Sequence, residues 1–175
     1  MRAIGKGSLA SILAIGLHIT RIILSISLVG IVVMLLIIPL LPSLAEMLSD
    51  WGDLEVADEG DEKLASLNVY FSVAHAFATT AVMLFVVNRL LEILKTLRLG
   101  SPFVKENADR FRAVGYALLI GEGAKFAFGF FSMIFRADID INSSFISWLA
   151  IIAVFVLAEV FREGARMKEE QDLTV

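Results

Sequence analysis

The sequence predicts an all-α integral membrane protein, a four-helix bundle whose two termini lie on the cytoplasmic side. Hydrophobic residues make up 58% of the 175-residue chain, and charged residues make up only 19%. The mean hydropathy of +0.80 is higher than a soluble domain needs. Four apolar runs are long enough to cross a hydrocarbon core of roughly 30 Å as helices. Acids and bases are segregated between the segments that join these runs, and no cysteine is present for disulfides or thiolate sites.

The first expected span, residues 22–41, contains no charged residue. The segment before it has three bases and no acid: Arg2, Lys6 and Arg21. A basic segment before an apolar run is also typical of a signal peptide, and Ser43 and Ala45 resemble a small-x-small cleavage site. Because the apolar run is too long for a signal peptide, we favour an uncleaved first span.

An acidic segment, residues 43–68, is expected to form the outer loop between the first two spans. Eight carboxylates and one base lie between residues 46 and 63. Carboxylates can bind Ca²⁺ or Mg²⁺, but this segment lacks the ligand spacing, the turn glycine and the terminal glutamate of a calcium loop. Asp138 and Asp140, in the second outer turn, lack the same features. We therefore expect solvated loops and no metal site.

The second expected span, residues 69–88, is followed by an amphipathic stretch and a turn. Leucines recur at helical spacing over residues 89–98, with charged side chains between them. This pattern predicts that the helix continues, either along the membrane surface or as a solvated end docked on its neighbours. Gly100 can adopt the left-handed conformation of a helix C-terminus, and Pro102 keeps the residue before it out of helical geometry. The inner loop, residues 89–112, therefore contains a sharp turn.

Two further apolar runs are expected to form the third span, residues 113–135, and the fourth span, residues 145–161. A charged helical tail, residues 162–175, follows. Glu122 lies ten residues beyond Arg112, which is held at the water boundary. Ten helical residues rise by roughly 15 Å, which predicts that Glu122 lies near the bilayer midplane.

Glu122 and Lys125 form the midplane charge pair that the sequence predicts. Their i, i+3 spacing lets the side chains meet, and a charge left facing lipid would cost on the order of several kcal/mol. Small residues at steps of four mark a face on which helices approach closely, and Lys125 lies in register with them: Ala113, Ala117, Gly121 and Gly129. The functional interpretation is an ion, proton or substrate site. The structural interpretation is a mutually neutralising pair that holds the bundle together, or a lysine that reaches towards the outer boundary.

The distribution of bases predicts the sidedness. The segments before the first span, between the second and third spans, and after the fourth span hold twelve Lys and Arg residues together, whereas the two remaining joining segments hold one each. Cytoplasmic loops carry the Lys and Arg excess. We therefore expect both termini and the inner loop on the cytoplasmic side of the bacterial inner (plasma) membrane.

The inner loop and the chain end resemble a known family. The inner loop carries a Gly-x-Pro-Phe turn followed by an asparagine, within the set Leu94, Leu97, Gly100, Pro102, Phe103, Asn107, Arg110, Arg112 and Gly115. The chain end contributes Phe161, Gly164, Glu169, Glu170, Gln171, Asp172, Leu173, Thr174 and Val175. In this order they resemble a bacterial four-span membrane family catalogued as domain of unknown function 2975. The resemblance covers most of the chain and implies a small helix-turn-helix regulator encoded nearby. It implies no reaction or ligand, and the midplane charge pair is not part of its motif.

We expect a non-enzymatic membrane regulator or anchor whose cytoplasmic loop and tail bind a partner. A basic helix-turn-helix regulator would complement the acidic tail. The alternative is a small transporter or channel that uses Glu122 and Lys125, which would need a homo-oligomer to form a pathway. No enzyme is expected, because the chain lacks a phosphate-binding glycine loop, a His-Glu-x-x-His motif and a nucleophile elbow. No cofactor is expected. The mixed charge of the inner face argues against direct nucleic-acid binding.

Overall fold

The computed structural model describes residues 9–40, 59–135 and 143–173, and these residues form an all-α structure without strands. Its elements are α1 (Leu9–Ile37), the 3-10 helix η1 (Ile38–Leu40), α3 (Glu59–Arg98), α4 (Lys105–Phe135) and α5 (Phe145–Asp172). Each of the four α-helices is long and apolar enough to cross a membrane. The predicted all-α class and the four helices are confirmed, and the chain is a multi-pass membrane protein.

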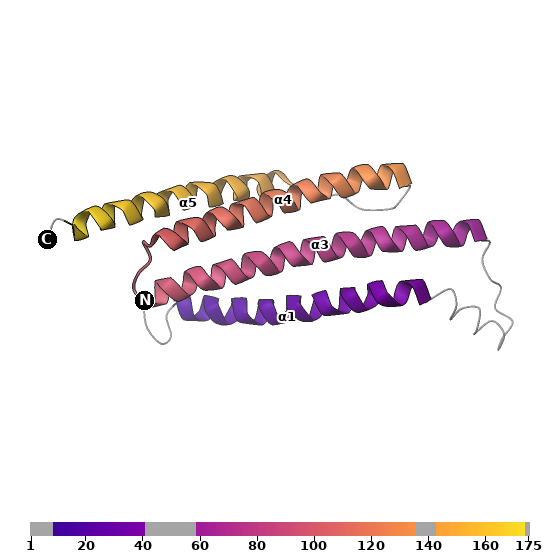
Figure 1. Ribbon diagram of the computed structural model, residues 1–175, viewed down its shortest axis with the longest axis horizontal. Helices are drawn as coiled ribbons and strands as arrows, with labels where there is room; N and C mark the ends of the chain where they lie inside the picture. Colours follow the sequence, from indigo (N-terminus) through magenta and orange to yellow (C-terminus); the bar gives the residue numbers. More distant parts are fainter. Residues whose placement is uncertain (1–8, 41–58, 136–142, 174–175) are drawn as a thin grey trace.

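The helices lie side by side in chain order, and neighbours run in opposite directions (Figure 1). Helix α1 packs on α3, α3 on α4, and α4 on α5. Three features lie together at one end of the molecule, which we call the turn end: the start of α1, the end of α5, and the α3–α4 turn (residues 99–104). The sidedness of the two termini and of the inner loop stays a prediction.

Helix α1 exposes most of its side chains. Small side chains such as Ala10 and Ala14 are buried, whereas large apolar ones such as Ile26 and Leu36 are exposed. Large apolar side chains on an exposed helix surface are typical of contact with lipid. The α-helix ends at Ile37, because Pro39 lacks a backbone N–H and disfavours α geometry at the residue before it.

Helix α3 has 40 residues and continues without a break through residues 89–98. At about 1.5 Å per residue it is roughly 60 Å long, twice the thickness of a hydrocarbon core, so it extends beyond the membrane. It also begins within the expected acidic loop, at Glu59. The expected loop residues 43–58 lie outside the described residues.

Candidate functional site

The α3–α4 turn has the conformation that its glycine predicts. Gly100 has φ of 81°, in the left-handed region that favours glycine. Its N–H donates to the carbonyl of Leu97 at 3.1 Å, and the N–H of Ser101 donates to the carbonyl of Thr96 at 3.2 Å. These bonds satisfy carbonyls at the end of α3 and reverse the chain into α4.

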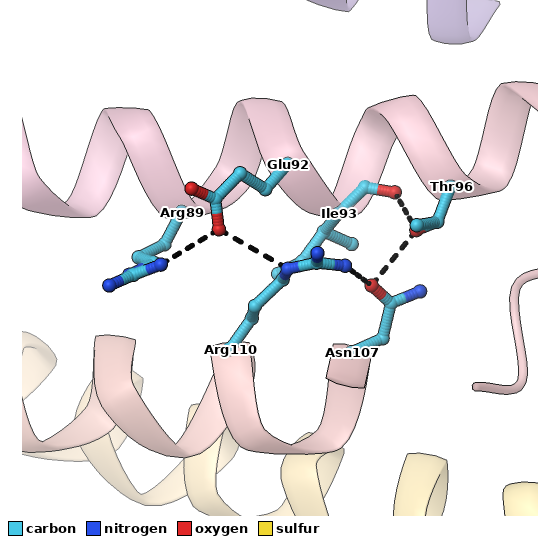
Figure 2. A network of polar contacts seen from close by, with 6 residues as sticks. All are labelled: Arg89, Glu92, Ile93, Thr96, Asn107 and Arg110. Carbon is cyan, nitrogen blue, oxygen red and sulfur yellow. Dashed lines mark hydrogen bonds and ion pairs between the residues drawn. The ribbon is translucent and has the colours of Figure 1, made fainter. Parts of the chain in front are cut away.

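Asn107 is the centre of a buried polar network at this turn (Figure 2). Its side chain is fully buried, and its Nδ2 donates to the carbonyl of Pro102 at 2.9 Å. Its Oδ1 accepts from the Thr96 hydroxyl at 2.9 Å and from Arg110 Nη1 at 2.8 Å. One amide therefore joins the last turn of α3, the loop and the first turns of α4.

Glu92 extends the network along α3 (Figure 2). Its Oε2 lies 2.8 Å from Arg89 Nη1 and 3.2 Å from Arg110 Nε, so the carboxylate pairs with one arginine of its own helix and one of α4. Arg112, predicted for the same site, is half-buried on α4, and no ion pair joins it to another described residue. The structure thus brings Asn107 and Arg110 together and leaves Arg112 outside the network.

Phe103 connects the turn to α5. Its ring lies 5.4 Å from the Phe161 ring, and Phe161 also contacts Phe111 of α4 at 4.8 Å between ring centroids. A Cβ atom on Gly164 would lie 2.5 Å from Phe103 Cδ1, which is closer than real contacts allow. Only glycine at position 164 lets the turn pack this tightly on α5, which explains why two separate parts of the predicted motif occur together.

The predicted tail residues lie on the exposed end of α5. Glu169, Glu170 and Asp172 are exposed, and Leu173, the C-cap, is 83% exposed. Thr174 and Val175, also predicted for the site, lie outside the described residues. This end of α5 is helical and solvent-accessible.

The ion pairs on this part of α5 are local. Arg162 pairs with Glu159, and Arg166 pairs with Glu163 at 2.6 Å and with Glu170 at 3.5 Å. All of these side chains are at least half exposed. Much of the acidic charge of the tail is therefore compensated along the helix surface.

Glu122 and Lys125 meet as their spacing predicts. Lys125 Nζ lies 2.7 Å from Glu122 Oε1, and Glu122 is only 6% exposed. Ser143, the residue before the α5 N-cap, donates from its hydroxyl to Glu122 Oε2 at 3.2 Å. A cavity of about 90 Å³ between α3 and α4 is lined by the pair together with His75 and Thr79. Sequence spacing gave no signal for Ser143, His75 or Thr79, because they lie outside α4.

The Ser143 hydrogen bond bears on the depth of the pair. The sequence predicts Glu122 at the bilayer midplane and the start of the fourth span at the outer boundary. These two levels are roughly 15 Å apart. The 3.2 Å hydrogen bond between Ser143 and Glu122 places the start of α5 at the level of Glu122. The two predicted depths therefore cannot both be correct. Helix α5 begins at the level of Glu122, while α4 continues to Phe135.

Among the residues that the structure describes, no group of three or more His, Asp or Glu side chains could hold a metal ion.

A family model described as Protein of unknown function (DUF2975) matches residues 43–175, which confirms the predicted resemblance. The match covers α3, α4 and α5 and leaves out α1. Neither the curated proteins nor the solved structures contain a match to the chain.

Proposed function

The chain belongs to the family described as Protein of unknown function (DUF2975), and we propose that it is a non-enzymatic membrane regulator or anchor whose turn end binds a cytoplasmic protein. In this proposal the protein resides in the plasma membrane with both termini in the cytoplasm. The partner is a basic helix-turn-helix regulator, the class that the family resemblance implies.

The observation that carries the proposal is the rigid connection between the turn and α5. Asn107 fixes the turn to α3 and α4, and Phe103 fixes it to α5 at Gly164. Beyond Gly164 the helix continues to Asp172 with exposed side chains. A binding surface that is already ordered before association loses less conformational entropy when a partner binds. The motif residues therefore support a preorganised surface more directly than they support a reaction.

Electrostatics supports the choice of partner to a limited degree. Residues 159–172 hold five acids and three bases, so this helix end is net acidic. Because most of these charges pair along the helix, they would influence orientation and association rate more than affinity.

Co-purification tests this proposal in the full-length protein. The tagged chain is extracted from membranes together with the helix-turn-helix regulator encoded beside it, and a reporter records the regulator's transcriptional output. Deleting residues 169–175 is expected to abolish co-purification and to change the output, while the protein still inserts into the membrane. Met133→Ala, at an 83% exposed position on the opposite end of α4, is the control and should change neither. If the deletion also changes neither, the regulator hypothesis is wrong.

A small transporter or channel is the second candidate, and the cavity beside Glu122 favours it. The cavity brings the carboxylate, Lys125, His75 and Thr79 together between two helices, and intramembrane ionisable groups often mark ion or proton pathways. Flux of protons and monovalent cations into proteoliposomes tests this function. Wild-type flux that falls in Glu122→Gln would support it, whereas absence of flux in the wild type would exclude it.

A further inference from the structure

A groove of about 770 Å³ lies between α1 and α3 near the turn end. Its volume is within the range of small-molecule sites, about 300–1,000 Å³. It is separate from the Asn107 network and from the Glu122 cavity, although Arg89 and Glu92 form part of its wall. Its lining combines a cationic part and an apolar part.

Carboxylates of the chain neutralise only part of the positive charge in the cationic part of the groove. Four bases and one carboxylate line the groove: Arg21, Arg89, Lys95, Arg98 and Glu92. Glu92 is already bound by Arg89 and by Arg110. Within residues 9–40, 59–135 and 143–173, no ion pair joins the remaining three bases to a carboxylate. These three side chains are exposed, so an anionic group can reach them.

The apolar part indicates which kind of anion fits. Ala14, Phe85, Leu91, Leu94 and Leu99 line the same groove. A free inorganic anion would leave this apolar surface in contact with water, which is unfavourable. A lipid places its phosphate among the bases and its acyl chains on the apolar wall, continuous with the lipid-facing surface of α1. Basic pockets between transmembrane helices are known to bind anionic headgroups by this combination.

We propose that the groove between α1 and α3 is a binding site for one anionic phospholipid, with its phosphate held by Arg21, Lys95 and Arg98. The site uses α1, which the family match does not include. It is independent of the regulator proposed above, since it lies on the α1 edge of the molecule and the proposed partner surface lies on α5 (Figure 1).

Lipid titration of the full chain in a non-ionic detergent tests the site. Native mass spectrometry follows the binding of phosphatidylglycerol, phosphatidylcholine and inorganic phosphate. The triple variant Arg21→Gln, Lys95→Gln, Arg98→Gln should bind phosphatidylglycerol more weakly by about fivefold per charge, on the order of a hundredfold in total. Wild-type protein should prefer phosphatidylglycerol over phosphatidylcholine.

The matched control removes three charges at the same end, outside the groove: Lys105→Gln, Arg162→Gln and Lys168→Gln. It should retain wild-type binding. Equal weakening in both triple variants, equal binding of the two lipids, or displacement of lipid by equimolar inorganic phosphate would each overturn the proposal. If the groove triple variant folds poorly, Lys95→Gln alone should still weaken phosphatidylglycerol binding by about fivefold. The double variant Arg21→Lys, Arg98→Lys keeps the charges and should keep wild-type binding. Failure of either result counts against the site.

Discussion

Asn107 and Glu122 are the two most deeply buried polar side chains in the described part of the chain, yet they are held in different ways. Asn107 is a neutral amide whose partners come from α3, the loop and α4. Glu122 is a carboxylate whose strongest partner, Lys125, lies one turn away on the same helix. From outside α4, the Ser143 hydroxyl donates to its Oε2.

The difference indicates different roles for the two clusters. Partners that are distant in the chain make the Asn107 network a connection between elements, so its loss leaves several groups unsatisfied. A pair within one helix mainly neutralises two charges and contributes less to the packing of neighbours. The turn is thus the structural centre of the motif, whereas the contact between Glu122 and Lys125 is local to α4.

Asn107→Leu should have the largest effect on stability. The apolar side chain leaves the Pro102 carbonyl without its donor and Arg110 Nη1 without its acceptor, each at about 1 kcal/mol or more, whereas the Thr96 hydroxyl keeps its bond to the Ile93 carbonyl. We expect the free energy of unfolding to fall by about 3 kcal/mol, measured by denaturant titration in detergent micelles.

Asn107→Asp is the control for this prediction. It keeps an acceptor for Thr96 and Arg110 and replaces the donor to Pro102 by a second acceptor oxygen, so it should cost about 1 to 2 kcal/mol. Equal losses in the two variants would show that the acceptor side of the network contributes little and would weaken the contrast with Glu122.

A double-mutant cycle on the charge pair should give the next largest effect. Glu122→Leu leaves Lys125 without its carboxylate and should lower the free energy of unfolding by about 2 kcal/mol. Combining it with Lys125→Leu should restore stability to within about 1 kcal/mol of wild type, because no uncompensated charge remains. The same denaturant titration measures all three variants. Additive losses would mean that the two side chains do not stabilise each other and would contradict a neutralising pair.

The sequence was sufficient for the features that depend on local pattern. Apolar runs predicted four helices, the glycine at position 100 predicted the left-handed turn, and i, i+3 spacing predicted that Glu122 and Lys125 meet. Each of these depends on residues within one or two turns of each other.

Features that depend on packing between helices were not accessible in this way. The resemblance identified Asn107 and Phe103 as motif residues, but the bond to Pro102 and the contact with Gly164 require the folded turn. The depth of the fourth helix was judged from hydropathy alone, which carries no information about register. The Ser143 hydrogen bond and the contact between the Phe126 and Trp148 rings show that α5 begins level with this part of α4.

Gly164→Val tests whether the turn is tightly joined to α5. The new side chain would overlap the Phe103 ring and should cost about 1 to 3 kcal/mol through overpacking. Gly123→Ala is the control, because no atom lies within 4 Å of its added Cβ; better helix propensity should stabilise it by about 0.5 to 1 kcal/mol. Thermal unfolding by circular dichroism compares them. If Gly164→Val is as stable as wild type, the contact is loose, and the preorganised surface loses its support.

Arg166→Gln should have the smallest effect, since it removes only exposed contacts. Arg166 pairs with Glu163 and Glu170 on the surface of α5, and all three side chains are at least half exposed. Pairs of this kind contribute about 0.2 to 0.5 kcal/mol each and weaken with salt. We therefore expect a loss of at most about 1 kcal/mol in the free energy of unfolding, shrinking further in 1 M salt. The substitution also makes the tail more acidic, so binding of a basic regulator should become tighter and more salt-dependent. A large loss of stability that salt does not reduce would instead mean that this helix end packs against another part of the protein, unlike the solvent-exposed surface on which the partner hypothesis depends.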